Sequence, residues 1–175
     1  MQLRELGQRI CILGPSNSGK STLAEAIARR CGWPAIHLDR LHHLPGTDWQ
    51  PRPQREFVAL HDAAIAGDAW VMDGNYSLCL PQRLRRATGL IVLDISTPLS
   101  LLRYARRSLS ATPRAGALAG NRDRITTAML HHIIAVTPAN RRRYAALYRE
   151  STLPKIRLAS ARAIDGCYRE WGLQR

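Results

Sequence analysis

The chain has 175 residues, and its 26 Lys+Arg against 13 Asp+Glu give a formal net charge of +13. This length fits one compact domain with its own core. No stretch approaches the roughly 18 apolar residues of a membrane helix, and residues 1–6 lack the apolar segment of a secretory signal. We therefore expect a cytoplasmic location and no membrane partner. The four cysteines form no Cys-x-x-Cys pair, which argues against a zinc knuckle or a redox pair.

The large positive charge is informative about the binding partners of the protein rather than about its fold. The lysines are Lys20 and Lys155, and all other basic residues are arginines. Arginine matches phosphate oxygens with a planar fork, so phosphorylated small molecules and nucleic acid are both candidate partners. Arginine is also favoured by high-GC genomes, so whether the charge is functional stays open.

Residues 14–21 fit the phosphate-binding pattern G-x-x-x-x-G-K-[ST]. Before them, residues 9–13 form a short run with β-branched residues, and after them residues 22–30 are good helix formers that end at Cys31-Gly32. A chance Gly/Ser-rich turn is the alternative, and the flanking strand and helix argue against it. The predicted phosphate-binding residues are Gly14, Pro15, Ser16, Asn17, Ser18, Gly19, Lys20, Ser21 and Thr22.

The chemistry of this loop predicts ATP and Mg²⁺ as ligands. Glycines let backbone N–H groups curl around an anion, and the helix that follows points its positive end at the same place. Lys20 would reach the β- and γ-phosphates, and Ser21 would ligate Mg²⁺.

Two further short strands each end near an acid. The pattern predicts a strand over 34–39 that ends in Asp39, and another over 69–76 that is broken at Asp73-Gly74. Such strand ends lie on the ligand side of an open α/β sheet. The stretch between these strands begins with an irregular Pro- and Trp-rich loop over 40–55. A helix then opens near Pro53, and its expected apolar face is Phe57, Leu60 and Ala64.

The second half continues the alternation of strands and helices. A short basic helix over 80–87 precedes a near-continuous apolar strand over 89–95. Ser96 or Thr97 then caps a helix with Pro98 in its first turn. The buried stripe of that helix is expected to be Leu99, Leu102, Ala105 and Leu109.

A linker at 110–120 leads to helical patterns from 123 to 136 and from 138 to 150. A fifth strand at 154–159 and a closing helix capped by Ser160 complete the chain. The fold class is therefore α/β, a P-loop NTPase with a five-stranded parallel sheet covered on both faces. We expect one domain over 1–175, with an acceptor flap at about 40–66 and a short lid at about 108–124.

In layout the chain resembles adenylate kinase and shikimate kinase. It resembles more closely the bacterial topology-modulation proteins, adenylate-kinase-related proteins often labelled as P-loop or AAA-type ATPases. Besides the loop, the resemblance rests on His37-Leu38-Asp39, the Trp/Pro segment 49–53, Trp70-Val71-Met72-Asp73-Gly74-Asn75-Tyr76, and the strand 90–94 with an arginine-bearing helix after it.

The resemblance implies roles at matched positions. Asp73 would hold Mg²⁺ through water, or would merely form the turn before Gly74. Asp39 would orient an acceptor hydroxyl or help to hold the metal, or would serve as a cap. Arg103 and Arg107 would neutralise the transferring phosphoryl group, or would lie on a solvated helix face. Arg122 and Arg124 fall in the lid, and Arg141–Arg143 read as a solvated basic face with a substrate or nucleic-acid role left open.

The acceptor side departs from nucleotide kinases, because the flap lacks their helical set of arginines. The first hypothesis is an ATP-dependent kinase, a transferase that moves the γ-phosphoryl group to an unidentified small acceptor. Nucleotides are among the candidate acceptors. The alternative is a nucleic-acid-associated ATPase or regulator of DNA topology, and a third reading is a nucleotide-binding switch without turnover.

Overall fold

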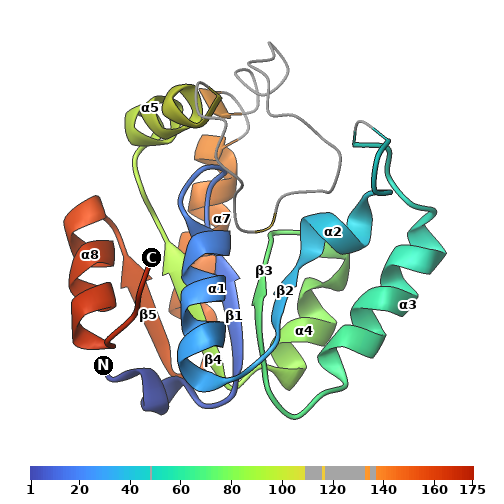
Figure 1. Ribbon diagram of the computed structural model, residues 1–175, viewed down its shortest axis with the longest axis horizontal. Coiled ribbons are helices and arrows are strands. Elements are labelled where there is room, and N and C mark those ends of the chain that lie inside the picture. The colour runs from blue at the N-terminus through green and yellow to red at the C-terminus, as the bar shows by residue number, and fades with distance from the viewer. Residues whose placement is uncertain (48, 109–115, 117–132, 135–136) are drawn as a thin grey trace.

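The computed structural model describes residues 1–47, 49–108, 116, 133–134 and 137–175, and of residues 107 and 108 it describes the backbone only. Five parallel strands form one sheet in the order β2-β3-β1-β4-β5 (Figure 1). Their bounds are β1 Arg9–Leu13, β2 Ala35–His37, β3 Trp70–Asp73, β4 Gly89–Leu93 and β5 Lys155–Leu158. The predicted α/β class and the five-stranded parallel sheet are confirmed.

Helices cover both faces of this sheet (Figure 1). The longer ones are α1 Lys20–Cys31, α3 Gln54–Ile65, α5 Thr97–Ser108, α7 Thr137–Glu150 and α8 Ala161–Glu170, and the shorter ones are α2 Leu38–His42, α4 Leu80–Arg86 and the 3₁₀ turns Leu3–Leu6 and Ser77–Cys79. None of the described helices is long and apolar enough to cross a membrane.

The alternation of side chains along the strands builds two separate cores. Ile10 and Ile12 of β1 pack on the side of α1 and α8, whereas Cys11 and Leu13 pack on the side of α3, α4 and α7. Because successive residues of a strand point to opposite faces, a strand that is apolar at every position serves both cores. Cys11 is fully buried, as expected for a small hydrophobic residue.

The local stop signals of the sequence are confirmed at two helices. α1 ends at Cys31, and Gly32 takes the left-handed conformation with φ 72°. Ser160 caps α8, because its Oγ accepts a hydrogen bond from the backbone N of Ala163 at 3.1 Å.

Three local predictions are wrong. β2 ends at His37, so Asp39 lies in the first turn of α2 rather than at the end of a strand, and the expected loop 40–55 begins with the end of that helix. On α3 the buried residues are Phe57, His61 and Ile65, while Leu60 is 37% exposed. The helix is thus turned so that His61 faces the core, and Ala64 lies at the edge of the contact.

The stripe expected on α5 is also wrong, because Leu102 is 54% exposed and Ala105 is exposed. α5 lies above the carboxyl ends of the strands instead of flat against the sheet (Figure 1). Its buried residues are Ser100 and Tyr104. Leu109, most of the expected lid and most of the helix expected over 123–136 fall outside the described residues.

Candidate functional site

The phosphate-binding pattern lies between β1 and α1, as the sequence predicts. α1 begins at Lys20, so the first N–H groups of the helix have no partner within it and point toward the loop. Gly14 has φ 150°, and a Cβ there would come within 2.4 Å of the carbonyl oxygen of Leu93. Only glycine therefore fits between β1 and β4 at the entrance of the loop.

Polar atoms of the loop are buried without hydrogen-bond partners among the described residues. They are Nδ2 and Oδ1 of Asn17 and Oγ of Ser18. Asn17 also has φ 61°, an uncommon conformation for a residue with a Cβ. Nζ of Lys20 donates to the carbonyl oxygen of Pro15 at 2.8 Å, so its ammonium lies over the same loop. The ammonium of Lys20 and the first N–H groups of α1 fit a phosphate chain such as that of ATP.

Ser21 and Asp73, the two predicted metal residues, are brought together. Oγ of Ser21 donates to Oδ2 of Asp73 at 2.6 Å, and the Asp73 side chain is 6% exposed. A hydroxyl and a carboxylate are oxygen ligands of the kind that Mg²⁺ prefers, together with phosphate oxygens and waters. The described part of the chain holds no group of three or more His, Cys, Asp or Glu side chains that could hold a metal ion.

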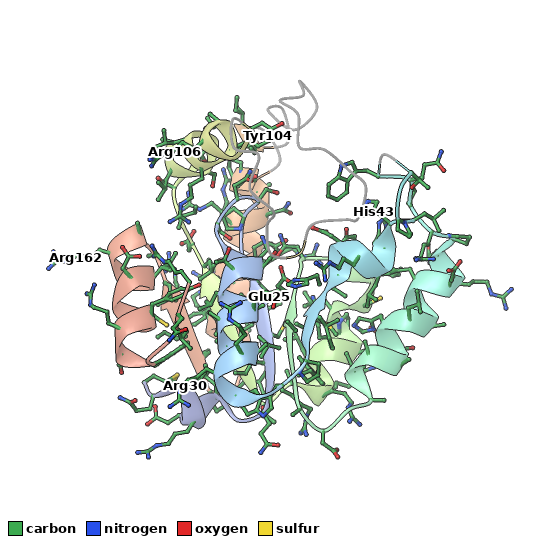
Figure 2. The ribbon with its side chains drawn as sticks, viewed as in Figure 1. Glu25, Arg30, His43, Tyr104, Arg106 and Arg162 are labelled. Atoms are coloured by element: carbon green, nitrogen blue, oxygen red, sulfur yellow. The ribbon has the colours of Figure 1, made fainter. Side chains whose placement is uncertain are left out.

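His37 completes the environment of Asp73, and the sequence analysis assigned it no role. Its Nδ1 lies 2.5 Å from Oδ1 of Asp73 and its Nε2 lies 2.9 Å from Oε1 of Glu25, which comes from α1 (Figure 2). Burial by itself lowers the pKa of His37, but the hydrogen bond and charge of Asp73 and the hydrogen bond of Glu25 outweigh it, so the pKa is raised. The sequence carries no signal for this contact, because the predicted strand 34–39 ends at Asp39 and the pairing of His37 with Asp73 depends on the strand order.

Gly116 lies against this group of side chains. Its φ is 72°, and a Cβ there would come within 2.9 Å of Oγ of Ser21 and 3.1 Å of Nδ1 of His37. Any larger residue at this position would have to displace the pair that holds Asp73, so glycine is required here.

Arg103 extends from α5 to the phosphate-binding loop. Its Nη1 donates to the carbonyl oxygen of Ser18 at 2.7 Å, and burial, followed by the charge of Arg175, lowers the pKa of its guanidinium. Arg103 is therefore not on a solvated face. Arg107 belongs to α5, but its side chain lies outside the described residues, as do Arg122 and Arg124.

Asp94, directly after β4, carries an ion-pair cluster that the sequence did not reveal. It accepts from Nε of Arg141 at 2.6 Å and from Nη2 of Arg157 at 2.5 Å. Burial alone raises the pKa of Asp94, but the two arginines outweigh it, so the net shift is downward. Arg142 and Arg143 are exposed, so the expectation of a solvated face holds for them and is wrong for Arg141.

Beside the loop, a pocket of about 260 Å³ opens between α2, α3 and the segment after β3; its lining is His42, Arg52, Gln54, Phe57, Tyr76, Ser77 and Leu78. Three rings pack together in its wall: His42 lies 5.0 Å from Phe57 and 4.6 Å from Tyr76, centroid to centroid. Burial, and then the charge of His43, lowers the pKa of His42. The wall is therefore largely uncharged at neutral pH.

The segment after β3 connects the pocket with the loop. Asn75 accepts from the backbone N of Gly14 at 3.2 Å and donates to its carbonyl oxygen at 2.7 Å. Tyr76 donates from its hydroxyl to Oδ1 of Asp39 at 2.7 Å. Asp39, the predicted acceptor-side acid, thus contacts a residue of the pocket lining, Tyr76, and is not itself one of the lining residues.

Comparison with solved structures gives a gluconokinase and two shikimate kinases. The chain is similar to a gluconokinase from Sinorhizobium meliloti 1021, with 18% identity over 95% of this chain and 90% of that one and a TM-score of 0.61. It is also similar to a shikimate kinase from Acinetobacter baumannii in complex with shikimate, with 16% identity, 94% and 91% coverage and a TM-score of 0.59.

A shikimate kinase from Bacteroides thetaiotaomicron is a third similar structure, with 21% identity, 93% and 94% coverage and a TM-score of 0.54. No protein family and no curated protein matches the sequence, so membership of the topology-modulation family stays a prediction. At these identities the likeness concerns the fold alone, a five-stranded parallel sheet with flanking helices.

Proposed function

We propose that the protein is an ATP-dependent kinase that transfers the γ-phosphoryl group to a hydroxyl of a small acceptor bound in the pocket beside Tyr76. The observation that carries this proposal is the contact between Ser21 and Asp73 at 2.6 Å at the head of a complete phosphate-binding loop. Asp73 is the last residue of β3, and the segment that follows it reaches the pocket. In that segment, Tyr76 lines the pocket and donates a hydrogen bond to a second acid, Asp39.

Each half of the reaction has its own residues in this proposal. The loop amides and Lys20 hold the β- and γ-phosphates, and Arg103 neutralises charge that develops on the transferring group. A magnesium ion held by Ser21, and through water by Asp73, would supply further charge neutralisation on the phosphates. Asp39 orients the acceptor hydroxyl and takes its proton as the new O–P bond forms and ADP leaves.

The lining of the pocket supports an acceptor of low charge. Arg52 is the cationic side chain of the lining; its Nη1 is paired with Glu56 at 2.6 Å, and its buried Nε lacks a hydrogen-bond partner among the described residues. A nucleoside monophosphate carries about two charges on its phosphate and calls for several cations. We therefore favour a neutral or singly charged hydroxylated compound that lies against the rings of His42, Phe57 and Tyr76.

An acceptor screen with ATP and Mg²⁺ tests this function. It should cover polyols, sugar acids, shikimate, nucleosides and nucleoside monophosphates, and we expect ADP release that depends on one of the first four groups. Lys20→Ala should abolish turnover without unfolding the protein. The matched control is Lys155→Ala, because this other lysine bonds to the backbone of Arg149 and Ser151 far along the chain. Unchanged ATP consumption in Lys20→Ala would contradict the proposal.

The net charge of +13 supports nucleic-acid binding as the alternative function. Exposed arginines lie on different helices: Arg30 on α1, Arg106 on α5 and Arg162 on α8 (Figure 2). Such binding would be independent of sequence and strongly dependent on salt. A gel-shift series with duplex DNA decides the question, since the absence of a shift at low salt rules this alternative out.

A further inference from the structure

Asp73 is held on both of its oxygens, and the two bonds come from different parts of the fold. Oδ2 accepts from Ser21 of α1 at 2.6 Å, and Oδ1 accepts from His37 of β2 at 2.5 Å. The second contact is fixed by the sheet itself, because His37 and Asp73 are paired residues in the register of β2 and β3. The carboxylate therefore has one orientation, with Oδ2 toward the loop.

His37 is itself fixed from its far side. Its Nε2 lies 2.9 Å from Oε1 of Glu25, and its side chain is 2% exposed, while that of Glu25 is 30% exposed. Since each ring nitrogen faces a carboxylate oxygen, which only accepts hydrogen bonds, both nitrogens act as donors. The ring cannot rotate without losing both bonds, so α1 supports Asp73 through Glu25 and His37 as well as through Ser21.

We propose that His37, supported by Glu25, is a positioning residue that holds Asp73 in the orientation required to bind the metal-bound nucleotide. The inference rests on the proposed function, because it concerns the Mg²⁺ that Ser21 and Asp73 fit. Side chains that orient a metal-binding carboxylate through hydrogen bonds typically contribute 10- to 100-fold in affinity. His37 touches neither the nucleotide nor the acceptor in this role.

The experiment compares binding of a non-hydrolysable ATP analogue with Mg²⁺ and with EDTA by isothermal titration calorimetry. The ratio of the two dissociation constants, the magnesium effect, is the readout. In His37→Leu we expect the magnesium effect to fall about 10- to 100-fold, while binding in EDTA changes little. A general defect of folding would weaken both measurements together and leave the ratio unchanged.

Conservative variants separate positioning from packing. The Asn side chain places its Nδ2 where His places Nδ1, so His37→Asn keeps the donor to Asp73 and should retain most of the magnesium effect. Glu25→Gln changes a partly exposed side chain, so it should fold normally and lose a smaller part of the effect. The matched control is His61→Leu, because His61 is equally buried but contacts Asp62 on the opposite side of the sheet.

Two results would overturn the inference. An equal magnesium effect in His37→Leu and the unchanged protein, with both folded, contradicts the role of His37 and leaves the proposed kinase function intact. The absence of any magnesium effect in the unchanged protein contradicts the proposed metal-binding role of Ser21 and Asp73. That result would overturn both the metal part of the proposed function and this inference.

Discussion

The hydroxyl of Tyr76 donates a 2.7 Å hydrogen bond to Oδ1 of Asp39, and the ring of the same tyrosine forms part of the pocket wall. Tyr76 thus holds the acid that we place beside the acceptor hydroxyl. Burial raises the pKa of Tyr76, with Asp39 adding to the shift, so the phenol stays protonated and acts as a donor.

Tyr76→Phe should therefore impair the acceptor side of the reaction alone. Because Asp39 is exposed, the lost bond is worth about 1 kcal/mol, roughly a fivefold loss in kcat/KM for the acceptor. Steady-state kinetics with the acceptor found in the screen measure this loss, and calorimetry should show unchanged nucleotide affinity. A matching drop in nucleotide affinity would place Tyr76 in support of the loop instead.

Arg103→Ala should reduce turnover far more than it reduces nucleotide binding. The guanidinium bonds to the carbonyl oxygen of Ser18, at the loop where charge develops during transfer, and the loss of one such donor costs about 10²- to 10³-fold in kcat. Arg106→Ala, an exposed arginine of the same helix, is the control and should leave kcat unchanged. Equal effects of the two substitutions would show that α5 contributes only general charge.

Asp94→Asn should lower the free energy of unfolding at pH 7 by about 1–3 kcal/mol, because a buried carboxylate that pairs with Arg141 and Arg157 is lost. Since the pKa of Asp94 is lowered in the fold, this stabilisation is present above the ordinary carboxyl pKa of about 3.9 and is lost as pH falls through the lower folded value. Urea unfolding at pH 7, 5 and 3 measures it. A difference between the two proteins that grows toward pH 3 would contradict the assignment.

Arg83→Met should raise the melting temperature. Arg83 is fully buried in α4, and none of its three guanidinium nitrogens has a hydrogen-bond partner among the described residues. Its charge lowers the pKa of the nearby Cys11 thiol, although burial has the larger effect and raises it. Taking a charge out of water costs several kcal/mol unless a partner compensates it, so an apolar side chain of similar length should stabilise the fold. A lower melting temperature would mean that a bound anion or water compensates the charge.

The fold could be predicted because its signals are local. The apolar runs 9–13 and 89–95 contain the observed strands β1 and β4, and the loop pattern with its glycines indicates a strand before it and a helix after it. The wrong predictions concern positions at which tertiary contacts decide which side chain is buried. Leu60 of α3 looks like a core residue by hydrophobicity alone, but the angle at which the helix lies on the sheet buries His61 instead.

The sequence could predict Ser21 and Asp73, which the structure brings together, but not the side chains that support them. Ser21 follows from the loop pattern and Asp73 from the resemblance, whereas His37 contacts Asp73 through the register of β2 and β3. That register depends on the strand order, which no short pattern contains. Arg83 gave no signal either, because in the sequence it belongs to the same basic run as Arg85 and Arg86.

The segment 73–76 contacts three parts of the candidate site at once: the hydroxyl of Ser21, the backbone of Gly14 and the carboxylate of Asp39. A displacement of this segment would therefore disturb the proposed donor, metal and acceptor sites together. For enzyme engineering, this means that new acceptor specificity is better sought at lining residues outside this segment. Arg52 and Gln54 also line the pocket, and a library at those two positions leaves the segment 73–76 intact.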